Sequence, residues 1–384
     1  MYGYGEGVKL NDYLPYWGMY SGSLVEYLNN LDFDCYAASV GPFSSAWDRA
    51  CELYAQLFGG TVDYGVAHSK EHGHNRFGRT YDKPLVENIG ERNLDGTIKK
   101  INLIGHSFGG ETIRMLSHLL EYGSKDERKA TLPRDISPLF VGGKGRIIHT
   151  ITTIASPHNG ITTFYANRST IDITNYLAFL LANIVGNTEL NRYYDVHLEQ
   201  FNLSGDSPVS RSLGKAFNTV GVAEIVQGRD NIYYDLSING AKKMNQFLLM
   251  NPRSYYFSFA TCAENELKKC LVSSYIKTFV NMVRNEAMDK IQLMARNPLN
   301  NVDVDEKWRA TDGAANTYST LAPLDEKTVH FSCPERTQKG IWNVMDVVYV
   351  KHMEIVGKVV KNADKESFYH FYVKHLNMIN SLKD

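Results

Sequence analysis

The sequence predicts an α/β fold, in which a mostly parallel β-sheet is covered by helices on both faces. Segments typical of strands alternate with segments of helical periodicity along the 384 residues. The content of 43% hydrophobic and 22% charged residues suits a globular chain with a large core. In addition, a short apolar strand near residue 101 leads directly into a glycine-flanked serine and then a helix. We expect one domain over residues 1–384.

The individual elements follow from local patterns. A helix is predicted after residue 44 and closed by Gly59, and an amphipathic helix near the carboxyl end places Phe368 and Leu376 on one face. Residues 161–230 are predicted to be helical and locally very apolar, and to form an inserted cap. The expected strands are residues 34–40, 101–104, 146–156, 254–262 and 342–350.

The stretch INLIGHSFGGETIRML, residues 101–116, carries the strongest local signal. It reads strand, Gly-x-Ser-x-Gly, helix, which is the context of a nucleophile elbow, where the serine hydroxyl is exposed at a sharp turn. Gly105, Gly109 and Gly110 are expected where strand and helix approach most closely. Ser107 is therefore a candidate nucleophile, and the alternative is an ordinary serine at a strand–helix junction. With this motif the α/β prediction becomes an α/β-hydrolase fold with an inserted cap.

A serine nucleophile needs a histidine base and a carboxylate, which follow the serine in this order: Ser, Asp or Glu, His. His330 and His352 remain after the other histidines are set aside, including His375, for which we expect a partly exposed structural role. His352 directly follows a predicted strand and is the better candidate. Asp312 lies before a glycine in a turn-prone loop, and Asp346 lies within a strand pattern and is less suitable.

Composition excludes several function classes. The net charge is −1 with no basic block, so nucleic acid is not an expected partner. The longest apolar run, Tyr176–Val185, is about half of the roughly 20 residues that span a bilayer, so no transmembrane segment is expected. That run would suit a lid helix or a plain core helix. No signal peptide is visible at Met1.

Three histidines, His68, His72 and His74, fall within seven residues, with Asp48 upstream. Such a cluster is compatible with a polar surface or with a metal site. Two imidazoles and two carboxylates would suit a closed, tetrahedral and therefore structural Zn²⁺ site.

Longer motifs resemble a known family. Residues 40–81, together with GHSFGGETIRML, TTIASPHNG, YYDLSINGAKKMNQF, WRATDGAANT and KHMEIVG, resemble the bacterial thermoalkalophilic, zinc-containing lipases over nearly the whole chain. The resemblance implies Ser107 as nucleophile, Asp312 as orienting acid and His352 as base. It also implies hydrolysis of acylglycerol esters through an acyl-enzyme, contact with a lipid–water interface and an extracellular location. The oligomeric state remains unknown.

The resemblance further implies a structural zinc ion held by Asp48, His68, His74 and Asp235 within an insertion at residues 40–81, with His72 as a neighbour that does not ligate. Trp47 matches an aromatic residue that packs beside the zinc in the family. Calcium is not expected, because Val359 stands where the resemblance calls for an acidic ligand.

The amino terminus departs from the family pattern. Family members begin with an apolar strand and an HGFxGxG-like loop, whereas this sequence opens with MYGYGEG. We expect the first strand to be missing and a sheet edge to be exposed. Of the two oxyanion donors, Phe108 would supply one, and Met1 falls at the position of the other. Two functions therefore stay open: an ester hydrolase, and a catalytically impaired lipase-like protein that keeps lipid binding and the structural zinc.

Overall fold

The computed structural model describes residues 5, 8–162, 193–201, 225–263, 304–358 and 362–383. Most of the cap expected at residues 161–230, including Tyr176–Val185, lies outside these residues, as do Met1 and Val359. Within the described part, no helix is long and apolar enough to cross a membrane.

A five-stranded sheet forms the centre of the molecule, and every neighbouring pair of its strands is parallel. This confirms the predicted parallel sheet. The order of the described strands is β3-β4-β5-β7-β6, so β3 lies at one edge of the described sheet. The strands are β3 (Ile101–His106), β4 (Ile148–Ile154), β5 (Tyr255–Phe259), β7 (Trp342–Val344) and β6 (Thr328–His330).

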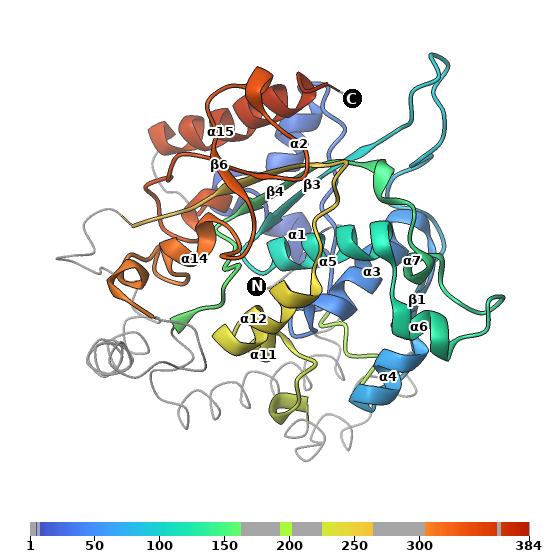
Figure 1. The fold of residues 1–384 in the computed structure, drawn as a ribbon. Helices are drawn as coiled ribbons and strands as arrows, with labels where there is room; N and C mark the ends of the chain where they lie inside the picture. The colour runs from blue at the N-terminus through green and yellow to red at the C-terminus, as the bar shows by residue number, and fades with distance from the viewer. Residues whose placement is uncertain are drawn as a thin grey trace.

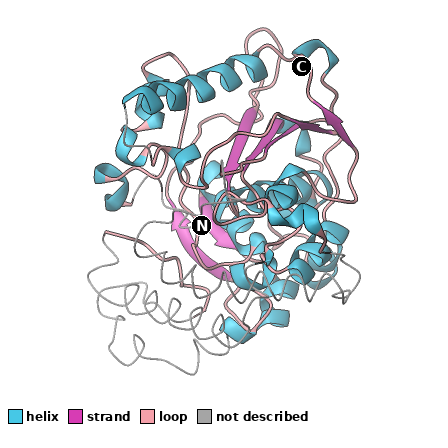
Figure 2. Cartoon of the chain, turned by 90° about the vertical axis from the view of Figure 1, so that its left-hand side faces the viewer, coloured by secondary structure: helices cyan, strands magenta, loops and turns pink. Residues whose placement is uncertain are grey.

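Helices cover both faces of this sheet (Figures 1 and 2). On one face, α3 (Ala46–Phe58) and α5 (Gly109–Tyr122) share a hydrophobic core with side chains of β3 and β4. On the other face, α2 (Leu24–Asn29) and α15 (Asn362–Asn380) share a second core with side chains of β4 and β5. Because successive strand residues point to opposite faces, a strand covered on both faces buries nearly all its side chains, and every residue of β5 is buried.

Shorter elements surround these layers. The strands β1 (Gly60–Asp63) and β2 (Phe77–Tyr81) form a separate antiparallel pair. The remaining helices are α1 (Lys9–Tyr13), α4 (Val66–His72), α6 (Lys125–Ala130), α7 (Pro138–Val141), α11 (Ile232–Asp235), α12 (Ile238–Phe247) and α14 (Thr317–Leu321). Single 3₁₀ turns are η1 (Met19–Ser21), η2 (Gly145–Ile147), η5 (Glu306–Arg309), η6 (Pro334–Arg336) and η7 (Glu354–Val356).

Most predicted elements are present, but two strand predictions need correction. Residues 34–40 form no strand, although the segment lies beside the sheet, because no described strand pairs with it. The strand predicted at residues 342–350 ends at Val344. Residues 34–40 have strand character but no described strand to pair with, and strand structure requires such a neighbour. Beyond Val344 the chain still bonds to the segment after β5, since the Val348 N–H donates to the Ala260 carbonyl, but only as an isolated bridge rather than a continuous ladder.

Two of the three glycines around Ser107 are required by close packing. A Cβ on Gly105 would collide with the backbone of Gly109 and Gly110, and a Cβ on Gly110 would collide with the side chain of Ser156. A Cβ on Gly109 would meet nothing within 4 Å. The expectation of close approach is therefore right for Gly105 and Gly110 and wrong for Gly109.

This difference gives a matched pair of variants. Gly105→Ala should lower the free energy of unfolding by about 2 kcal/mol or more, because the backbone of α5 must move away from β3. Gly109→Ala should leave the free energy of unfolding unchanged or raise it by about 0.5 kcal/mol, because alanine has less freedom in the unfolded chain. Denaturant unfolding measures both. Equal destabilisation by the two substitutions would contradict this packing at the turn.

Candidate active site and metal site

The three residues implied as a triad lie at the carboxyl ends of parallel strands. Ser107 follows β3 at the turn into α5 and has a left-handed φ of 55°. Asp312 lies in the loop before α14, and His352 lies in the loop after β7. Positive φ is uncommon for a residue other than glycine, and its place between strand and helix matches the strained turn of a nucleophile elbow.

A chain of hydrogen bonds joins these side chains. His352 Nε2 lies 2.9 Å from Ser107 Oγ, and His352 Nδ1 lies 2.8 Å from Asp312 Oδ2. All three residues are at least nine-tenths buried. The structure therefore brings together the serine, acid and histidine that the sequence analysis selected.

Asp312 is surrounded by donors suited to a carboxylate. The N–H groups of Ala314 and Ala315 donate to Oδ1 at 3.0 and 2.8 Å, and the Thr261 hydroxyl donates to Oδ2 at 2.5 Å. Burial alone would raise the pKa of Asp312, but the His352 imidazole and these donors hold it below its usual value. Thr261 was missed by the sequence analysis, and its only signal is its position just after β5.

His106 was also missed, although it stands inside the Gly-x-Ser-x-Gly motif. Its Nε2 lies 3.0 Å from the carbonyl oxygen of His352, and its Nδ1 lies 2.6 Å from the Tyr16 hydroxyl. Burial holds the pKa of His106 well below its ordinary value, so the ring is neutral. Nε2 then carries the proton given to the carbonyl, and Nδ1 accepts from Tyr16. His106 thus positions the backbone of His352.

The histidines set aside earlier have other partners. His330 Nε2 lies 3.1 Å from Asp346 Oδ1 on the surface, so the two less favoured candidates pair with each other. His375 is buried rather than partly exposed, and its Nε2 lies 2.8 Å from the Thr152 hydroxyl.

Of the two expected oxyanion residues, Phe108 is described and Met1 is not. Phe108 directly precedes α5, and among the described residues no acceptor takes its N–H. Its ring is fully buried, with the Arg49 guanidinium 4.9 Å from the ring centroid. The backbone N–H beside Ser107 is thus free to donate to another group.

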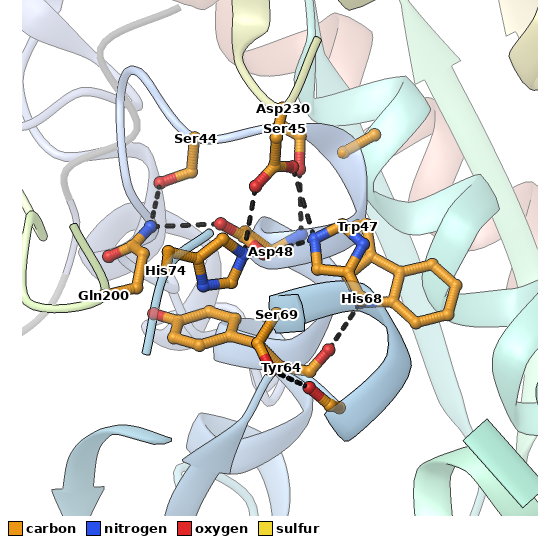
Figure 3. A network of polar contacts seen from close by, with 12 residues as sticks. Ser44, Ser45, Trp47, Asp48, Tyr64, His68, Ser69, His74, Gln200 and Asp230 are labelled. Carbon is orange, nitrogen blue, oxygen red and sulfur yellow. Dashed lines mark hydrogen bonds and ion pairs between the residues drawn. The ribbon is translucent and has the colours of Figure 1, made fainter. Parts of the chain in front are cut away.

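A second polar cluster joins Asp48, His68, His74 and Asp230 (Figure 3). His68 Nε2 lies 3.2 Å from Asp48 Oδ1 and 3.3 Å from Asp230 Oδ1, and His74 Nε2 lies 3.1 Å from Asp230 Oδ2. The four candidate ligand atoms all lie within 4.8 Å of one another. This is a possible metal site.

Neighbouring groups orient the members of this cluster. His74 Nδ1 lies 2.8 Å from the Asn75 carbonyl, which leaves Nε2 as the ligand atom, and Trp47 stacks on His68 with 4.9 Å between ring centroids. Burial and Asp230 raise the pKa of Asp48. Although burial opposes it, the carboxylate of Asp230 raises the pKa of His68 to about 10. Without a cation, the two carboxylates would therefore hold protons on the imidazoles.

Asp235, the expected fourth ligand, is not part of the cluster, and Asp230 takes that place. Asp235 ends the short helix α11, and its Oδ2 accepts the Ala46 N–H at 2.7 Å, which caps the start of α3. Asn231, the N-cap of α11, directly follows Asp230, and α11 then ends at Asp235. The position expected from the resemblance is therefore five residues after the aspartate that joins the cluster. His72 lies outside the group.

Comparison with known proteins places this chain in a family. The family model described as "Lipase-like, C-terminal domain" matches residues 1–383. This chain belongs to that lipase-like family. It is 32% identical over 350 residues to Lipase 2 of Staphylococcus aureus strain MRSA252, which covers 90% of this chain. It spans about half the length of the curated relatives it matches.

Solved structures of similar proteins share the fold. Lipase 1 from Pelosinus fermentans has 35% sequence identity and a TM-score of 0.76, over 100% of this chain and 97% of the other. EstA from Clostridium botulinum has 34% identity and a TM-score of 0.75, over 97% of this chain and 84% of the other. These similarities confirm the predicted family and α/β-hydrolase fold.

This lipase-family chain also buries a carboxyl group beneath the nucleophile. Glu111, in the first turn of α5, is 1% exposed, and neither of its side-chain oxygens has a hydrogen-bond partner. His158 Nδ1 lies 3.6 Å from Glu111 Oε1, but burial keeps the pKa of His158 well below its ordinary value, so that ring is neutral. Burial raises the pKa of Glu111 to about 7.

Glu111 should therefore make stability depend on pH. Since the unfolded carboxyl ionises near pH 4.5 and the folded one near 7, the folded state binds more protons between these values. The free energy of unfolding of the wild type, relative to Glu111→Gln, should fall by about 3 kcal/mol as pH rises from 4 to 8. Denaturant unfolding at both pH values measures this. Glu91→Gln, an exposed carboxyl, is the control, and equal pH dependence in all three proteins would contradict the burial effect.

Proposed function

We propose that this chain hydrolyses carboxylic esters, with acylglycerols as the substrate class, through Ser107, His352 and Asp312. The observation that carries the proposal is the hydrogen-bond chain Ser107–His352–Asp312 at the elbow of a lipase-family fold. A serine hydroxyl is a weak nucleophile unless a neighbouring base takes its proton, and His352 Nε2 lies within reach of that proton.

The reaction follows from this arrangement. Ser107 Oγ attacks the ester carbonyl while His352 takes its proton, and the protonated imidazole then gives that proton to the departing alcohol. Water repeats the sequence on the acyl-enzyme and releases the fatty acid. Asp312 keeps the His352 Nδ1 proton in place and stabilises the imidazolium, which requires an ionised carboxylate; its lowered pKa supports this role.

The backbone N–H of Phe108 supplies one donor to the tetrahedral oxyanion, as the residue after the nucleophile does in this fold. The acyl-chain preference, the lipid–water interface and the extracellular location remain predictions from the family resemblance.

A fluorophosphonate probe tests the nucleophile. Wild-type protein should be labelled at Ser107, as located by peptide mapping, and Ser107→Ala should not be labelled. Asp312→Asn should slow labelling and ester turnover on the order of 10⁴-fold, because the wrong imidazole tautomer is favoured.

Ser117→Ala, a buried serine on the same helix α5, is the matched control and should label normally. Folded wild-type protein that never labels would contradict the hydrolase proposal and favour an impaired, lipid-binding relative.

We further propose that the cluster of Asp48, His68, His74 and Asp230 holds a structural zinc ion. Ligand atoms about 2.0–2.1 Å from a tetrahedral zinc lie about 3.3 Å from each other. Three of the four imidazole–carboxylate separations, 3.1, 3.2 and 3.3 Å, fit that geometry, and the fourth, from His74 Nε2 to Asp48 Oδ1, is longer at 3.9 Å. His74 Nε2 and Asp230 Oδ2 are buried and have no hydrogen bond, although they lie 3.1 Å apart, and a cation between them would satisfy both. Four protein ligands fill the tetrahedron, so the ion would join α3, α4 and the loop before α11.

Zinc removal should therefore destabilise the protein more than it slows catalysis. A chelator should lower the melting temperature and release about one zinc per chain, measured by elemental analysis, while the initial rate on a short ester changes little. Asp230→Asn should lose the metal, whereas Asp235→Asn should keep it, because an amide oxygen can still accept the Ala46 N–H. Retention of zinc by Asp230→Asn and loss by Asp235→Asn would refute this ligand assignment.

A further inference from the structure

The proposed base, His352, lies in a loop and not in a helix or strand. We call residues 352–357 the histidine loop; its regular part is the single 3₁₀ turn η7. A side chain on a loop is placed only as precisely as the loop is held, and a general base must stay within hydrogen-bond reach of the proton that it takes. The contacts that hold the histidine loop therefore bear directly on the proposed reaction.

The main chain of His352 is held on both sides. Its N–H donates to the carbonyl oxygen of Asp312 at 3.0 Å. Its carbonyl oxygen lies 3.0 Å from His106 Nε2, and His106 directly precedes Ser107. The backbone of the base is thus bonded to the acid on one side and to the neighbour of the nucleophile on the other.

A segment near the start of the chain, residues 16–21, holds the far end of the histidine loop. The Gly18 N–H donates to the Val356 carbonyl at 2.8 Å, and the Ser21 hydroxyl donates to the Gly357 carbonyl at 2.9 Å. A Cβ on Gly357 would collide with the backbone of Gly18. The two segments, far apart in sequence, therefore pack backbone against backbone.

Tyr16 begins this segment and connects it with His106. The Tyr16 hydroxyl lies 2.6 Å from His106 Nδ1, and both residues are buried. A neutral imidazole has one N–H, and the His352 carbonyl can only accept, so the proton belongs on Nε2 and Nδ1 needs a donor. The Tyr16 hydroxyl is that donor. In the other tautomer, an unprotonated Nε2 would face the carbonyl oxygen and the bond would be lost.

We propose that Tyr16 is a positioning residue for the hydrolysis and acts through His106: its hydroxyl stabilises the imidazole tautomer that holds the histidine loop in place. The inference rests on the proposed function, because it names what keeps His352 Nε2 within reach of Ser107 Oγ. Tyr16 itself takes no part in proton transfer. Residues 16–21 thus hold the histidine loop at two points, directly through Gly18 and Ser21 and indirectly through Tyr16.

A purely structural hydroxyl would behave differently from this one, and a glutamine at position 106 separates the two roles. The Nε2 of glutamine can occupy the place of the imidazole Nε2 and donate to the His352 carbonyl, but an amide has no alternative tautomer. The Tyr16 hydroxyl should therefore matter for turnover when residue 106 is histidine and not when it is glutamine. A structural hydroxyl would matter equally in both backgrounds.

Kinetics of p-nitrophenyl butyrate hydrolysis test this prediction. Tyr16→Phe should lower kcat about tenfold, the equivalent of one lost hydrogen bond, and leave KM within about twofold, because the ester site is untouched. His106→Gln should turn over close to the wild-type rate, and adding Tyr16→Phe to it should change kcat little. His106→Leu, which removes the donor, should be slower than either single variant.

The matched control is Tyr256→Phe. Tyr256 is also a buried tyrosine, and its hydroxyl accepts the Asn251 N–H at 2.7 Å, far from His106 in the fold of the sheet. This variant should lower the melting temperature and keep kcat. Thermal unfolding shows that each variant folds.

A second measurement does not depend on turnover. The His352 Nδ1 proton, hydrogen-bonded to Asp312, should give a downfield proton NMR resonance that is absent from Asp312→Asn. Tyr16→Phe should shift or broaden that resonance, and Tyr256→Phe should not. Wild-type kcat and an unmoved resonance in Tyr16→Phe, or equal slowing by Tyr16→Phe with histidine and with glutamine at position 106, would each overturn the positioning role. A shifted resonance in a protein that never reacts with a fluorophosphonate would uphold that role and refute the hydrolase.

Discussion

The sharp crossing from β3 to α5 is the constraint on which the site depends. Ser107 has a left-handed backbone at the end of a buried strand, and Gly105 and Gly110 let the helix begin against that strand. This crossing places Ser107 Oγ above the carboxyl edge of the sheet. The loops after β5, β7 and the segment before α14 then supply Thr261, His352 and Asp312 to the same edge. A parallel sheet makes that convergence possible, because all its strands end on one side.

Two carboxyl groups, Asp312 and Glu111, are buried near this edge, and their pKa values shift in opposite directions. Asp312 is buried with three donors and an imidazole, so its charged form is the stable one. Glu111 is buried as deeply without a hydrogen-bonded donor, so its pKa rises. The same burial therefore favours opposite protonation states, and the nearby donors decide which. For a proposed triad, this contrast matters because only the ionised carboxylate can stabilise an imidazolium.

The sequence was most informative where one local pattern determines the structure. The Gly-x-Ser-x-Gly turn, the helix closed by Gly59 and the strand before residue 106 are set by neighbouring residues, and all lie where expected. Prediction failed where the outcome depends on distant chain. Residues 34–40 have strand composition, but none of the described strands pairs with them. The choice of Asp230 over Asp235 depends on how α11 folds back onto α3. Thr261 and His106 act through contacts that no spacing along the chain reveals.

Helix α3 contributes residues both to the cluster of Asp48, His68, His74 and Asp230 and to the surroundings of Phe108. Asp235 caps its first turn, and that turn carries Asp48 into the cluster with His68, His74 and Asp230. The next residue, Arg49, lies over the ring of Phe108. About one and two turns further along, Leu53 and Leu57 belong to the hydrophobic core that α3 shares with α5 and β3. Asp48 and Arg49 are consecutive residues in the first turn of this helix, so an interaction that holds Asp48 also restrains the backbone of Arg49. A cluster distant from Ser107 in sequence is in this way joined, through two adjacent residues of one helix, to the residue that follows Ser107.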